Sequence, residues 1–116
     1  VYVHEIAGYE NTQNVRPTEW LCEPCLWTPT WTHCGVVHAK ARCTVSVLDS
    51  VKLHNTMRTC RCVSFRIARY AEQFVMHLNG LDESALTDLT IPSFNAEEAV
   101  QLGRMCSTVS ETRSVA

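Results

Sequence analysis

The sequence predicts an α+β fold, with a cysteine-rich antiparallel β front half followed by two or three α-helices. The hydrophobic periodicity changes near residue 65 from two residues, typical of strands, to the longer period of helices. Six of the seven cysteines lie before that change, between Cys22 and Cys62. Hydrophobic residues make up 46% of the chain and charged residues 19%, as in ordinary globular proteins.

The length of 116 residues is typical of one domain. We therefore predict a single small domain over residues 1–116, made of a cysteine-rich β and loop part over 1–64, a helical part over 65–106 and a frayed tail over 107–116. No run of about 18 apolar residues occurs, so the sequence predicts no membrane span.

The front half contains one clear strand pattern and three weaker features. Residues 1–7 suggest a short β segment, and the polar residues 10–17 suggest a loop. From 37 to 47 apolar and polar residues alternate strictly, which predicts a strand with one buried face. Asp49 and Ser50 supply turn residues, so a second strand over 57–65 is expected to pair back on the first.

The back half follows a helical period. Apolar residues at helical spacing predict an amphipathic helix over 65–79, and Gly80 stands where a left-handed C-cap is needed. A short helical turn is expected over 83–89. Asn95 can cap a last helix over 95–106, because Glu98 follows three residues later as in a capping box.

The clustered cysteines predict disulfide bonds. The segment between residues 8 and 35 has few large aliphatic side chains, and each native disulfide typically contributes about 2–4 kcal/mol to a loop-rich segment of this kind. The pairing cannot be deduced from sequence. The six candidates are Cys22, Cys25, Cys34, Cys43, Cys60 and Cys62, with Cys106 left over. On this interpretation no cofactor is expected.

A zinc site is the first alternative, because Cys22-Glu23-Pro24-Cys25 has the spacing of a zinc knuckle. Two ligand sets are open: Cys22 and Cys25 with Cys60 and Cys62, or Cys22 and Cys25 with His33 and Cys34. Under this interpretation the chain is an intracellular module. It contacts nucleic acid or protein through its Trp-rich and basic segment, since residues 36–69 hold seven basic residues against one acid.

Two family resemblances accompany these interpretations. Residues 20–25 resemble the W-C-x-P-C active site of the thioredoxin family, which implies a thiol oxidoreductase with Cys22 as nucleophile and Cys25 as resolving thiol. Leu21 departs from that motif, because it stands between the tryptophan and the first cysteine. The cysteines Cys22, Cys25, Cys43, Cys60 and Cys62 also resemble the C-terminal half of cystine-knot signalling proteins, which implies an extracellular protein.

The function predicted from these patterns is a non-enzymatic, disulfide-stabilised module that binds a protein partner. It is expected to be secreted or to act in another oxidising compartment. No phosphate-binding loop or H-E-x-x-H motif is present, so an enzyme other than a thiol oxidoreductase is disfavoured. The expected contact residues are aromatic anchors flanked by basic side chains: Trp20, Trp27, Trp31, Lys40, Arg42 and Arg61.

Overall fold

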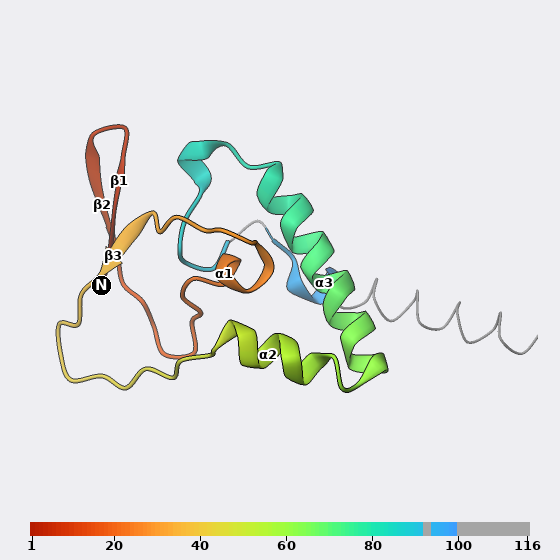
Figure 1. The fold of residues 1–116 in the computed structure, drawn as a ribbon. Helices are drawn as coiled ribbons and strands as arrows, with labels where there is room; N and C mark the ends of the chain where they lie inside the picture. The colour runs from red at the N-terminus through yellow and green to blue at the C-terminus, as the bar shows by residue number, and fades with distance from the viewer. Residues whose placement is uncertain (92–93, 100–116) are drawn as a thin grey trace, which may run out of the picture. The chain divides into compact units, whose positions relative to one another are not determined.

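The computed structural model describes residues 1–91 and 94–99 and confirms the α+β fold (Figure 1). The chain separates into two compact units. Unit 1 contains residues 1–47 and 80–91, and unit 2 contains residues 48–79 together with the described residues 94–99. The prediction of one domain over 1–116 stays a prediction.

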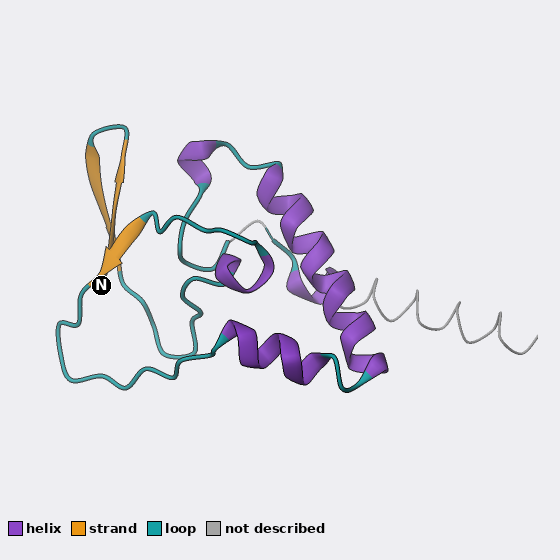
Figure 2. Cartoon of the chain, viewed as in Figure 1, coloured by secondary structure: helices purple, strands orange, loops and turns teal. Residues whose placement is uncertain are grey.

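Unit 1 contains a three-stranded antiparallel sheet in the order β2-β1-β3 (Figure 2). The strands are β1 (Tyr2–Ile6), β2 (Tyr9–Gln13) and β3 (Gly35–Val37). Ala7 and Gly8 join β1 to β2 with positive φ angles of 53° and 83°, the backbone that a tight hairpin turn requires. The predicted β segment over 1–7 is confirmed. The predicted loop over 10–17 is wrong for residues 10–13, because β2 pairs with β1 despite its polar sequence.

The predicted strand over 37–47 is also wrong beyond its first residue. β3 ends at Val37, and residues 38–49 form neither helix nor strand. Alternation produces a strand only when its apolar face is buried, whereas Val45 is 66% exposed and Val47 is 90% exposed. The alternating pattern therefore lacks the packing that would stabilise a longer strand.

The predicted second strand over 57–65 is wrong, because Met57 ends α2 (Ser50–Met57), residues 58–60 connect the helices, and residues 61–65 open α3 (Arg61–Asn79). Asp49 is the N-cap of α2 and not a strand-connecting turn: its carboxylate accepts a hydrogen bond from the backbone N–H of Lys52 at 3.0 Å. The helix predicted over 65–79 is confirmed, and α3 begins four residues earlier.

Aromatic packing forms the core of unit 2. Phe74 and Leu78 of α3 are buried, and the ring of Phe94 packs edge-on against Phe74 with centroids 5.2 Å apart. Tyr70 packs edge-on against the same Phe94 at 5.6 Å. The apolar face of α3 that the helical spacing predicts is therefore the face that is buried.

The predicted cap at Asn95 is present. Its side-chain oxygen accepts a hydrogen bond from the backbone N–H of Glu98 at 3.1 Å, and residues 96–99 are helical. The remainder of the helix predicted over 95–106, the predicted tail over 107–116 and Cys106 lie outside the described residues.

Short elements complete unit 1. They are the single-turn helix α1 (Pro24–Trp27), the 3₁₀ turn η1 (Glu83–Ala85) and an isolated antiparallel bridge between Leu21 and Leu89. The turn predicted over 83–89 is thus confirmed over three residues. None of the helices in the described part of the chain is both long and apolar enough to cross a membrane.

Candidate metal centre

A buried carboxylate organises the loops of unit 1. Asp88 is only 2% exposed, although it carries a charge that is costly to remove from water without partners. Its backbone carbonyl accepts a hydrogen bond from the N–H of Cys22 at 2.7 Å, next to the bridge between Leu21 and Leu89. Residues 21–22 and 88–89, far apart in sequence, are therefore held side by side.

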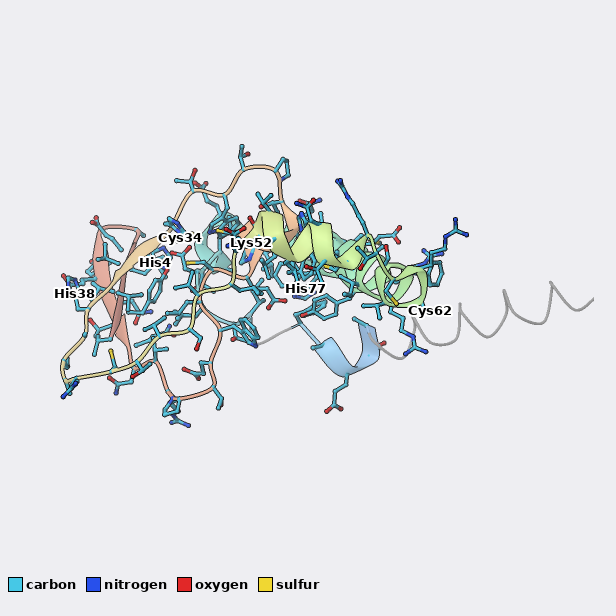
Figure 3. The ribbon with its side chains drawn as sticks, turned by 60° about the horizontal axis from the view of Figure 1, so that its bottom comes forward. His4, Cys34, His38, Lys52, Cys62 and His77 are labelled. Atoms are coloured by element: carbon cyan, nitrogen blue, oxygen red, sulfur yellow. The ribbon has the colours of Figure 1, made fainter. Side chains whose placement is uncertain are left out.

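One oxygen of this carboxylate binds the sheet. Oδ2 of Asp88 accepts hydrogen bonds from the hydroxyl of Tyr2 at 3.1 Å and from the backbone N–H groups of Cys34 at 2.7 Å and Gly35 at 2.9 Å. Cys34 immediately precedes β3 and His38 follows it, as labelled in Figure 3. The carboxylate thereby fixes the start of β3 against Tyr2 of β1.

Gly35 is required for this approach. A Cβ atom at this position would collide with the carbonyl oxygen of Val3 and would lie 2.6 Å from the ring of Tyr2. The Tyr2 ring itself is 1% exposed and cannot move aside without opening the core of unit 1. The absence of a side chain at Gly35 therefore allows β3, Tyr2 and Asp88 to meet.

The other oxygen faces a more polar and more accessible group of side chains. Oδ1 of Asp88 accepts a hydrogen bond from the indole N–H of Trp31 at 2.8 Å and lies 3.2 Å from Nδ1 of His33. The same Nδ1 lies 3.4 Å from Sγ of Cys22. The His33 side chain is 60% exposed, whereas that of Asp88 is 3% exposed, so the group opens toward solvent on the histidine side.

The charge state of this group follows from its surroundings. Burial alone raises the pKa of Asp88, but the hydrogen bonds from Trp31, Gly35, Cys34 and His33 outweigh it and lower the pKa below its usual value. Burial raises the pKa of the Cys22 thiol, and the negative charge of Asp88 raises it further. At neutral pH the carboxylate is therefore ionised, while the thiol keeps its proton unless a cation compensates for its charge.

Two of the three distances between the donor atoms match the spacing of metal ligands. Sγ of Cys22, Nδ1 of His33 and Oδ1 of Asp88 all lie within 4.8 Å of one another. Tetrahedral zinc, with bonds of about 2.3 Å to sulfur and about 2.0–2.1 Å to nitrogen and oxygen, separates sulfur from nitrogen by about 3.6 Å and nitrogen from oxygen by about 3.3 Å. The corresponding distances of 3.4 and 3.2 Å agree with these values.

The same geometry argues against a cysteine–histidine–aspartate catalytic triad. In a triad one ring nitrogen contacts the nucleophile and the other contacts the carboxylate. Here Nδ1 of His33 makes both contacts, to Cys22 and to Asp88. The imidazole is therefore not placed to relay a proton from the thiol to a second group.

The backbone at Cys22 is unusual and helps to form the group. Its φ of 61° lies in the left-handed region, which is uncommon for residues other than glycine and recurs at functional sites. The carbonyl of Cys22 accepts a hydrogen bond from the N–H of Cys25 at 3.0 Å, which closes a turn into α1. Two hydrogen bonds, at its N–H and at its carbonyl, hold this conformation.

The structure brings together two of the four residues of one predicted zinc site, the one made of Cys22, Cys25, His33 and Cys34. Cys22 and His33 come together as that set requires, whereas Cys25 and Cys34 do not belong to the group of three. Asp88 was not singled out in the sequence, where it is one polar residue between Thr87 and Leu89 without a motif. Among residues 1–91 and 94–99, no other group of three potential metal ligands lies as close together.

The remaining candidate cysteines are exposed. Cys60 and Cys62 belong to unit 2, where both are exposed, and Cys43 is exposed in the loop after β3. No disulfide bond joins any two of the six cysteines in the described residues of this structure. The disulfide framework, and the zinc set that includes Cys60 and Cys62, stay predictions.

The predicted contact residues differ in exposure. Trp20 is 57% exposed, whereas Trp27 and Trp31 are half-buried and their indole N–H groups donate to Glu23 and Asp88 respectively. The basic residues are exposed: Lys40 and Arg42 lie in the loop after β3, and Arg61 begins α3. Of the three tryptophans, Trp20 is the one most available to a partner.

No protein-family model, curated protein or solved structure matches the chain.

Proposed function

We propose that unit 1 is a zinc-binding module in which Cys22, His33 and Asp88 hold one metal ion. The observation that carries this proposal is the convergence of a thiol, an imidazole nitrogen and a carboxylate oxygen within 4.8 Å. Sulfur and nitrogen donors with one carboxylate suit zinc, which accepts all three. Water completes the coordination of an ion that has three protein ligands.

The electrostatics of the group support a cation. An imidazole Nδ1 carries at most one proton, yet here it faces both the Cys22 sulfur and the Asp88 oxygen at close range. Without a metal, these neighbouring atoms compete for the one proton on Nδ1. A divalent ion between the three atoms would attract all of them. It also compensates for the charge of the Cys22 thiolate beside a buried carboxylate.

The metal would act as a structural crosslink. It would join residues 20–25, 31–35 and 87–89, which carry no long helix or strand, and so replace the disulfide staples expected for such loops. We further propose that the stabilised module binds a protein partner, with the exposed Trp20 in the contact surface. A thiolate–zinc site does not require an oxidising compartment, so this function is compatible with either predicted location.

A zinc titration of the reduced, metal-free chain tests the proposal. We expect one zinc ion per chain in competition with a chromophoric chelator. Because the side chain of His33 is 60% exposed, His33→Ala removes a ligand with little effect on the fold. Removal of a residue that only hydrogen-bonds to a metal ligand typically lowers the metal affinity about 10–100-fold. Removal of the ligand His33 should therefore lower the zinc affinity at least as much.

His38→Ala is the matched control, because His38 is also exposed and lies outside the group of three. Its zinc affinity should equal that of the unmodified chain. Binding of no zinc, or equal affinity in the two histidine variants, would contradict the proposal.

A further inference from the structure

A second thiol lies beside the proposed ligand Cys22 without belonging to the metal group. Cys25 follows three residues later, and its backbone N–H donates to the Cys22 carbonyl at 3.0 Å. This bond closes a turn, and the first and fourth Cα atoms of such a turn lie within about 7 Å. Disulfides join residues whose Cα atoms are about 4.4–6.8 Å apart, so the turn brings Cys22 and Cys25 into range of each other.

Cys34 is a poorer partner for Cys22. Its thiol donates to the carbonyl oxygen of Thr32 at 3.8 Å, within its own loop, and its backbone N–H is committed to Asp88 at 2.7 Å. Cys22 and Cys25 are both only half-buried, so a small reagent can reach them. Among the thiols of unit 1, the turn therefore favours the pair Cys22 and Cys25.

We propose that Cys22 and Cys25 form a reversible oxidation site whose disulfide and the bound zinc exclude each other. This inference rests on the proposed zinc site, because Cys22 supplies the sulfur ligand. A sulfur that has formed an S–S bond no longer offers a thiolate to the metal. Oxidation would then leave only His33 and Asp88 as ligands and release the ion.

The oxidant is a small-molecule disulfide. The Cys25 thiolate attacks one of its sulfurs, forms a mixed disulfide and expels one thiolate. Cys22 then attacks the Cys25 sulfur and expels the second thiolate. Two cysteine thiols are oxidised to one disulfide, the reagent is reduced to two thiols, and the protons lost by the cysteines are taken up by the products. In the zinc-loaded chain Cys22 gives up Zn²⁺ instead of a proton, and water supplies the missing proton.

The test treats the full reduced chain with glutathione disulfide, with and without one equivalent of zinc, after zinc binding itself has been measured. Remaining thiols are blocked with a maleimide. Chymotryptic peptides are then mapped, because cleavage after Trp27 or Trp31 separates Cys22 and Cys25 from Cys34. We expect a Cys22–Cys25 disulfide that forms at least about tenfold more slowly in the zinc-loaded chain. Each disulfide formed there should release one zinc ion to a chromophoric chelator.

Two cysteine variants make the result specific. Cys25→Ser should bind zinc as the unmodified chain does and should release none of it to the oxidant. Cys34→Ser should behave like the unmodified chain in both respects. Equal oxidation rates with and without zinc, or a Cys22–Cys34 disulfide, would overturn this inference and leave the zinc site standing. A chain that binds no zinc before the oxidant is added would overturn both.

Discussion

Replacing Asp88 with asparagine tests the central role of the buried carboxylate. An asparagine side chain has one acceptor oxygen and one NH₂ group where the carboxylate has two acceptors. If the NH₂ group replaces Oδ1, it faces the indole N–H of Trp31; if it replaces Oδ2, it faces the backbone N–H groups of Cys34 and Gly35. Either orientation leaves a donor without an acceptor.

The expected loss follows from these contacts. One buried donor without a partner costs about 1–3 kcal/mol, and hydrogen bonds to a charged acceptor exceed neutral ones by about 1 kcal/mol each. The lowered pKa of Asp88 indicates that its donors outweigh burial, so removal of the charge yields no compensating gain. With the NH₂ group at the Oδ1 position, one unpaired donor and three weakened hydrogen bonds to the remaining oxygen add up to about 4–6 kcal/mol. We therefore expect Asp88→Asn to lower the free energy of unfolding by about this amount, a large share of the total of about 5–15 kcal/mol for a typical domain.

Urea unfolding followed by tryptophan fluorescence measures this loss, because all three tryptophans lie in unit 1. A chelator keeps zinc out, so that the hydrogen bonds alone are tested. Asp82→Asn is the control, since Asp82 is exposed and its side chain makes no capping hydrogen bond; it should change the stability by less than about 0.5 kcal/mol. A loss below about 1 kcal/mol for Asp88→Asn would refute the reasoning.

The dependence of stability on pH in the acid range tests the same carboxylate independently. Its folded pKa is lowered from the usual value of 3.8, so its contribution to stability is complete above that value and is lost as the pH falls below it. In the metal-free chain, the stability difference between the unmodified protein and Asp88→Asn should therefore shrink below about pH 3.8. A difference that grows on acidification would contradict this assignment.

Three further substitutions test the packing of each unit. Gly35→Ala should cost more than about 2 kcal/mol, because its Cβ meets the Tyr2 ring, and an unchanged thermal midpoint of tryptophan fluorescence would disprove that contact. Asp49→Ala should lower the unfolding free energy by about 1 kcal/mol, measured by circular dichroism, through loss of the cap on the Lys52 N–H; no change would mean that the cap is unimportant. Phe74→Ala should cost about 3–5 kcal/mol and speed amide exchange in α3, whereas unaltered exchange would place Phe74 outside the core.

The elements predicted correctly are those whose local pattern agrees with their packing. The apolar period of α3 coincides with the buried side chains Phe74 and Leu78, and the cap at Asn95 is a purely local feature. Residues 37–47 show the opposite case. Their alternation is as regular as that of any strand, yet Val45 and Val47 remain exposed, because no segment among the described residues covers them.

The candidate site was only partly predictable for a related reason. Cys22 and His33 belong to residue types that attract attention as ligands, and they lie eleven residues apart. Asp88 joins them through a single bridge and through hydrogen bonds to residues more than fifty positions away. A long-range contact of this kind leaves no periodicity or spacing in the sequence. The buried acid becomes recognisable only when its donors are placed around it.

X-ray absorption at the zinc edge of the one-to-one complex tests the proposed centre most directly. Ligation by Cys22, His33 and Asp88 predicts one sulfur at about 2.3 Å, with the remaining ligands nitrogen or oxygen at about 2.0–2.2 Å. Two or more sulfurs would instead favour a site that includes Cys25 or another cysteine. A shell without sulfur would contradict the proposed centre altogether.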